Sequence, residues 1–326
     1  MKGAGLFLLL ASLLTQAAPS QAPAPKAADP EPFVLGVLRR DGVVSPFAAF
    51  DGRSWSAPWP EALRYLEIPI TLDAVPGKWW GKAGLPAEMT IWTNGSRRGT
   101  LRLGRPTTLR VMCATRLGLT SSYRATEPAP PPMEQPYPKD GLVISGGQMI
   151  EAIESVPRTS PEWVPAAVSL IEPFDRAELA AINAFTDWKH PISRADRRKA
   201  PVELETMYRA PMDEPGWTAY YLEAIKRYPA GRDDGDCGLV TSAAGFAAIG
   251  PGGKHWFRLY ARVTYCDRAG STFMLPLGLI KARGRSHWIY QLSGYDREGY
   301  VVVHPTPSLI EPLAQYLAGI CSRGGA

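Results

Sequence analysis

The sequence predicts a β-rich α+β protein: a small all-β N-terminal domain, a barrel or a sandwich, precedes a larger domain with an antiparallel sheet covered by helices. Three observations predict this class. The 32 Pro and 31 Gly indicate many turns and short strands rather than a helical bundle. Residues 257–265 alternate apolar and polar side chains, as a half-buried strand does. Six prolines within residues 127–138 indicate a stiff, extended linker that divides the chain.

The N-terminus has the pattern of a secretory signal peptide. Lys2 supplies a positive charge, an apolar run follows over residues 6–14, and small residues stand at cleavage spacing near Ala18 and Ala22. The apolar run is shorter than the roughly 20 residues that a membrane-spanning helix needs. We therefore expect residues 1–22 to be removed and residues 23–32 to form an Ala/Pro-rich tether. The mature chain is expected to be periplasmic or extracellular, with no transmembrane segment.

Residues 33–124 form the predicted N-terminal β-domain. Two short apolar segments, 34–38 and 43–47, are joined by Arg39-Arg40-Asp41-Gly42, in which the Asp-Gly pair favours a hairpin. Further strands are expected at 66–72, 88–93, 99–103 and 107–113. This part carries 13 Lys and Arg against 6 Asp and Glu, whereas residues 125–326 carry 21 against 23. An anionic partner should therefore contact the first domain.

After the linker at 125–138, residues 139–326 form the predicted α+β domain. An acidic start and apolar residues at helical spacing predict an amphipathic helix over Asp175–Phe185. Strands are expected at 257–265, 272–280, 287–292 and 300–304. Their close spacing favours an antiparallel meander, because parallel neighbours need long crossovers. The pattern around residues 221–228 is compatible with either a helix or a strand.

A final helix is expected over Leu309–Ile320. Ser308 and Glu311 have the spacing of a capping box, in which each side chain bonds a backbone N–H at the helix start. The leucines at positions 309, 313 and 317 share one face of such a helix. This helix is expected to cover the sheet of the second domain together with Asp175–Phe185.

The four cysteines are Cys113, Cys237, Cys266 and Cys321. In an exported protein an even count indicates up to two disulfides, and the sequence leaves all three pairings open. Only Cys113 lies in the N-terminal half, so pairing of all four requires one bridge between the halves; otherwise Cys113 is free. No CxxC, HExxH or HxH spacing occurs, so neither a metal site nor a cofactor is predicted.

The strongest binding signal is Lys78-Trp79-Trp80-Gly81-Lys82, with Arg97 and Arg98 in the same domain. Paired indoles between ammonium groups suit an anionic envelope polymer, a glycan or lipid headgroups. The competing interpretation is that these indoles fill the core of the β-domain. The leading hypothesis is a non-enzymatic envelope or extracellular binding or structural module. Nucleic acid is not expected, because the net charge of +5 is modest and no basic helix is present.

The alternative is a hydrolase or transferase with its site in the C-terminal domain. Cys266 and Asp267 follow His255 in the sequence, and His287 lies nearby. A Cys–His pair performs acyl transfer when the histidine holds the thiol as thiolate. The competing interpretation is a disulfide between Cys237 and Cys266, the more usual role in an exported protein. No Gly-x-Ser-x-Gly elbow, P-loop or dinucleotide fingerprint occurs.

Overall fold

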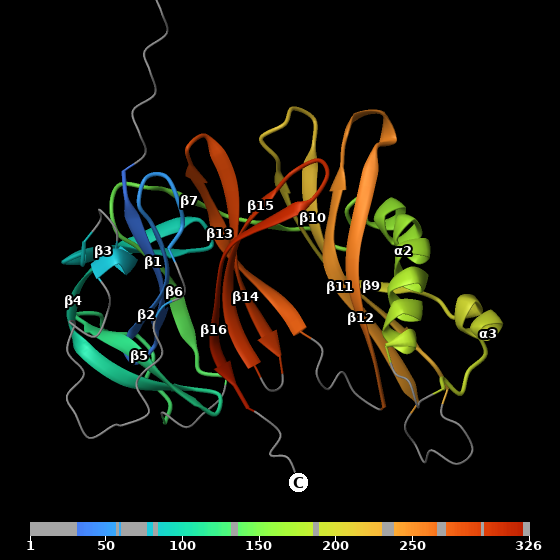
Figure 1. The fold of residues 1–326 in the computed structure, drawn as a ribbon, viewed down its shortest axis with the longest axis horizontal. Coiled ribbons are helices and arrows are strands. Elements are labelled where there is room, and N and C mark those ends of the chain that lie inside the picture. The colour runs from blue at the N-terminus through green and yellow to red at the C-terminus, as the bar shows by residue number, and fades with distance from the viewer. Residues whose placement is uncertain are drawn as a thin grey trace, which may run out of the picture.

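The computed structural model describes residues 31–56, 59, 77–80, 84–131, 136–184, 189–229, 238–265, 272–294 and 297–321. These residues form successive layers (Figure 1): a barrel, a central sheet, an outer sheet and a helix on the far face of the outer sheet. Every strand pair in the barrel and in both sheets is antiparallel. The predicted β-rich, antiparallel class is confirmed.

Six strands close into a barrel in the order β1-β2-β5-β4-β3-β6. They are β1 (Phe33–Arg39), β2 (Val44–Phe50), β3 (Glu88–Thr93), β4 (Ser96–Val111), β5 (Ala114–Ser121) and β6 (Lys139–Ile144). The barrel closes because β6 pairs with β1 on one side and with β3 on the other. Residues 125–138 therefore connect two barrel strands, β5 and β6. A short helix, α1 (Gly77–Trp80), lies against β2.

The hairpin predicted between the first two strands is present. Gly42 has a φ of 80°, and Asp41 Oδ1 accepts a hydrogen bond from the Val43 N–H at 3.2 Å, as an Asp-Gly turn requires. The strands expected at 99–103 and 107–113 are one continuous strand, β4. The strand expected at 66–72 lies outside the described residues.

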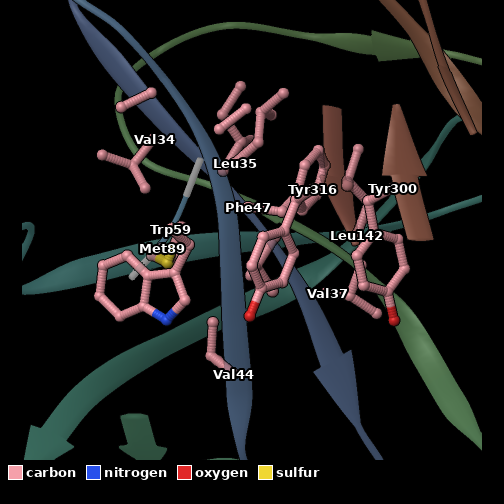
Figure 2. Close-up of a cluster of buried hydrophobic side chains, with 14 of the residues drawn as sticks. Val34, Leu35, Val37, Val44, Phe47, Trp59, Met89, Leu142, Tyr300 and Tyr316 are labelled. Atoms are coloured by element: carbon pink, nitrogen blue, oxygen red, sulfur yellow. The ribbon is translucent and has the colours of Figure 1, made fainter. Parts of the chain in front are cut away.

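The central sheet has the order β16-β15-β14-β13-β7 and is covered on both faces. Its strands are β7 (Ile150–Glu151), β13 (Thr272–Ala282), β14 (Arg285–Gly294), β15 (Arg297–Pro305) and β16 (Ile310–Ile320). Alternate residues point to opposite faces of a strand. Tyr300 and Val302 accordingly join the barrel core, whereas Val301 and Val303 face the outer sheet. Figure 2 shows Tyr300 beside Phe47 of β2, with ring centroids 5.2 Å apart.

The outer sheet has the order β12-β11-β10-β9-β8. Its strands are β8 (Glu154–Ser155), β9 (Glu203–Pro211), β10 (Thr218–Arg227), β11 (Leu239–Ile249) and β12 (His255–Tyr265), with a short helix η3 (Pro251–Gly253) between the last two. Two helices accompany it, α2 (Trp163–Asn183) and α3 (Arg194–Lys199). Leu170 and Phe174 of α2 are fully buried against this sheet. The expected helix at Asp175–Phe185 is confirmed up to Asn183 and begins earlier, at Trp163; the ambiguous segment at 221–228 is mostly strand β10.

The helix predicted over Leu309–Ile320 is wrong, because this segment is strand β16. Residues four apart share a face in a strand as well as in a helix, so the leucine spacing does not distinguish the two. Pro312, which lacks an N–H, is tolerated because β16 is an edge strand and its pairing with β15 shifts register near that residue.

Candidate ligand-binding cleft

The Lys-Trp-Trp-Gly-Lys segment packs its indoles inside the protein. Trp79 and Trp80 are 4% and 6% exposed, and their ring centroids lie 4.6 and 5.3 Å from that of Trp59. Trp59 Nε1 donates a hydrogen bond to the Leu117 carbonyl at 2.8 Å, which holds this aromatic cluster on β5. Lys82 and the side chain of Lys78 lie outside the described residues.

Arg97 and Arg98 are both exposed on β4, just after the turn that joins β3 to β4. The same strand exposes Arg102, Arg105 and Arg110. Of these, Arg102 pairs with Glu88 at 3.2 Å. The basic character of this part of the sequence is therefore concentrated along one barrel strand.

The residues of the enzyme hypothesis are only partly described. Cys266, Asp267 and Cys237 lie outside the described residues. His255 is exposed at the start of β12, and its Nδ1 lies 2.8 Å from the Gly253 carbonyl. His287 is buried on β14, in a different sheet, where burial and the neighbouring His304 lower its pKa to about 4. The two predicted histidines thus lie on separate sheets.

Cys113 and Cys321 form a disulfide that joins the end of the barrel strand β4 to the end of β16. The sequence left open whether Cys113 is free, and the structure shows it bonded. Arg116 of β5 adds a second connection, because its Nε donates a hydrogen bond to the Ala318 carbonyl at 2.7 Å. Strand β16 is thereby attached to the barrel on one side and paired with β15 on the other.

The described ranges contain neither a metal-binding cluster nor a membrane-spanning helix. No group of three or more His, Cys, Asp or Glu side chains in this part of the chain is arranged to hold a metal ion. None of its helices combines the length and the apolar character needed to cross a membrane.

A cleft of about 640 Å³ opens between the central and outer sheets. Its volume lies within the range of small-molecule sites, about 300–1,000 Å³. The outer sheet contributes the face of β10, β11 and β12 that is turned away from α2, and the central sheet contributes a largely apolar surface. Lining side chains from the central sheet include Tyr290, Leu292, Val301, Val303, Ile310 and Pro312.

The base of the cleft contains a buried carboxyl group. Glu223 is 7% exposed and accepts a hydrogen bond from the Met274 N–H at 3.0 Å. Burial raises the pKa of Glu223, and this effect outweighs the hydrogen bonds that lower it. Burial likewise raises the pKa values of Tyr221 and Tyr290, which also line the cleft, so both phenols are neutral at physiological pH.

The mouth of the cleft is formed by β12. Arg258, Tyr260 and Arg262 all line it and are all exposed. The alternation of residues 257–265 predicts one buried and one solvated face. The buried face, with Phe257 and Leu259, does pack beneath α2. The polar face borders the cleft. In the sequence this face is marked by Tyr260, which stands between Arg258 and Arg262.

Comparison with known proteins found no relative: no protein-family profile, no curated protein and no solved structure matches this chain.

Proposed function

We propose that this chain is an exported, non-enzymatic binding protein that holds a small apolar ligand in the cleft between its two sheets. The observation that supports this most directly is the cleft itself, because both sheets offer apolar side chains to a space of about 640 Å³. Sites for small molecules are mostly apolar, with a few placed polar groups. The tyrosines and Glu223 at the base are such groups.

Export is supported by the disulfide and by the N-terminal sequence pattern. Disulfides persist in oxidising compartments such as the periplasm and the extracellular space. The bridge between Cys113 and Cys321 fits that setting. A binding role is supported by the lining of the cleft, in which apolar side chains predominate and a few polar groups are placed among them.

Direct titration with linear alcohols tests this proposal, because these ligands are apolar and uncharged. Each methylene group that leaves water contributes about 0.8 kcal/mol, or roughly fourfold in affinity. Dodecan-1-ol should therefore bind about fifteenfold more tightly than decan-1-ol, as measured by calorimetry or by displacement of a fluorescent apolar probe.

A variant that fills the cleft locates the binding. Ala244 lines the cleft and is half-buried, so Ala244→Trp should place an indole in the ligand's space. The matched control is Ala180→Trp on the exposed face of α2. Binding that is lost in Ala244→Trp and kept in Ala180→Trp supports the cleft. Absence of alcohol binding in the wild type, or equal binding by both folded variants, would refute it.

A second candidate function rests on the exposed arginines of β4. Five exposed guanidinium groups along one strand favour contact with an anionic envelope polymer, an acidic glycan or lipid headgroups. Arg97→Gln combined with Arg98→Gln should weaken sedimentation with phosphatidylglycerol vesicles or cell-wall fractions. Lys78→Ala with Lys82→Ala tests the remaining charges of the predicted segment. If both double variants sediment like the wild type, Arg97, Arg98, Lys78 and Lys82 are excluded as the anionic contact.

A further inference from the structure

The cleft has an unusual combination of an apolar interior and a cationic edge. Strand β12 is the edge strand of the outer sheet, and its alternation places Arg258, Tyr260 and Arg262 on the same face. Across the cleft lies β16, the edge strand of the central sheet, which contributes Ile310, Pro312 and Gln315. A ligand between the sheets would therefore end beside two arginines.

These arginines have no acidic partner among the described residues, unlike several others in the protein. Arg209 pairs with Glu154 and Glu162, and Arg227 pairs with two glutamates as well. Arg258 instead donates a hydrogen bond from Nε to the Tyr260 hydroxyl at 3.0 Å, and its Cζ lies 5.9 Å from the centre of that ring. The tyrosine thus orients a guanidinium group without neutralising its charge.

The acidic group inside the cleft does not cancel this charge either. Glu223 is the one acidic side chain among the described lining residues, and it sits at the buried base rather than at the exposed mouth. Its raised pKa favours the neutral form more than in an ordinary glutamate. The mouth therefore keeps a net positive charge next to apolar surface.

We infer that the ligand of the cleft is a single-chain amphiphile with an anionic head, specifically a long-chain carboxylate, whose chain lies between the sheets and whose head contacts Arg258 or Arg262. This inference rests on the proposed binding function. A guanidinium group matches the planar carboxylate with two parallel hydrogen bonds. The two arginines stand four residues apart, about 13 Å along the strand, so the head contacts one of them rather than both. The cleft volume suits one chain rather than a two-chain lipid.

Two ligands of equal chain length distinguish the contribution of the head group to affinity from that of the chain. Dodecanoate and dodecan-1-ol are titrated at pH 8, where the carboxylate is ionised, into the wild type and into the double variant Arg258→Gln with Arg262→Gln. Dodecanoate should bind the wild type about tenfold more tightly than the alcohol, and the double variant should lose that advantage while binding the alcohol unchanged. High salt should reduce the difference in affinity between dodecanoate and dodecan-1-ol in the wild type, because it screens the charge of the arginines.

The matched control changes two arginines on the β13–β14 hairpin, Arg283→Gln with Arg285→Gln, which are exposed and lie outside the cleft. It should bind both ligands as the wild type does. Single substitutions of Arg258 and Arg262 then show which guanidinium holds the head.

Each contrary result has a distinct meaning. If the wild type binds dodecanoate and dodecan-1-ol with equal affinity, or the double variant still binds dodecanoate more tightly, recognition of an anionic head by these arginines is refuted. Binding of an apolar chain in the cleft is then still supported. If neither ligand binds, the proposed function itself fails. If the double variant loses binding to phosphatidylglycerol vesicles but not to dodecanoate, the arginines recognise a membrane headgroup and the inference is overturned.

Discussion

Replacing both Cys113 and Cys321 by serine should lower the free energy of unfolding by about 3–5 kcal/mol. The bridge joins residues 208 positions apart, and loop closure in the unfolded chain gives about 5 kcal/mol as an upper value for a loop of this length. A second, nested bridge between Cys237 and Cys266 would change that value by only about 0.1 kcal/mol, since the dependence on length is logarithmic. The folded state should change little, because β16 remains paired with β15.

The assay has two steps. Non-reducing peptide mapping of the mature protein first establishes the Cys113–Cys321 bridge in solution and shows whether Cys237 and Cys266 are bonded. Urea unfolding, followed by tryptophan fluorescence, then compares the wild type with the double serine variant and with a control carrying serine at positions 237 and 266. If mapping confirms the bridge and the double variant unfolds at the same urea concentration with the same slope, the loop-closure reasoning is wrong.

Three further changes test the packing and electrostatics. Lys226 is 1% exposed, and its Nζ lies 2.5 Å from Asp175 Oδ1 and 3.8 Å from Oε2 of the buried Glu178. Lys226→Met should cost about 3 kcal/mol in urea unfolding, because it removes the nearest cation from Asp175 and leaves Glu178 with Arg197 as its cationic partner among the described residues; an unchanged midpoint would contradict this. Burial lowers the pKa of His287 to about 4, below the unfolded value of about 6.5. Because the unfolded state binds the proton first, the wild type should lose roughly 3 kcal/mol between pH 6.5 and 4, a loss absent in His287→Gln. Gly95 has a φ of 72° and an added Cβ would meet a backbone nitrogen at 2.6 Å, whereas Gly84, with a φ of 62°, has open space. In thermal unfolding, Gly95→Ala should therefore be clearly more destabilising than Gly84→Ala. Equal losses of stability would show that the neighbouring backbone shifts to make room for the added Cβ.

Strands β1–β4 and β12–β15 were predictable because period-two alternation and turn residues are local signals, whereas β5, β6, β9 and β11 were not predicted. Strand β3 has the same bounds as its prediction, Glu88–Thr93, and β12 differs by two residues at its start. The helix prediction for the last segment was wrong because a spacing of four residues places side chains on one face in a helix and in a strand alike. Leucines four apart in residues 309–320 fit either element, and only the ladder with β15 decides for the strand.

The environment of the paired tryptophans was not predictable from their immediate neighbours. Lysine on both sides of Trp79 and Trp80 is compatible with an exposed site and with a core. Their burial depends on Trp59, about twenty positions earlier, and on the backbone of β5. Contacts between segments so far apart leave no periodic signal in the sequence.

The position of the cleft follows from a difference in burial between two strands, β15 and β12, that lie far apart in the sequence. Residues 300–303 of β15 are all buried, as expected for a strand covered on both faces by the barrel and the outer sheet. Strand β12 alternates instead, so one of its faces is not fully covered although a sheet lies opposite. An alternating edge strand opposite a sheet whose inner strand is fully buried marks the place where two sheets separate. Arg258 and Arg262 stand at that place, and the amphiphile inference depends on the unneutralised charge they carry there.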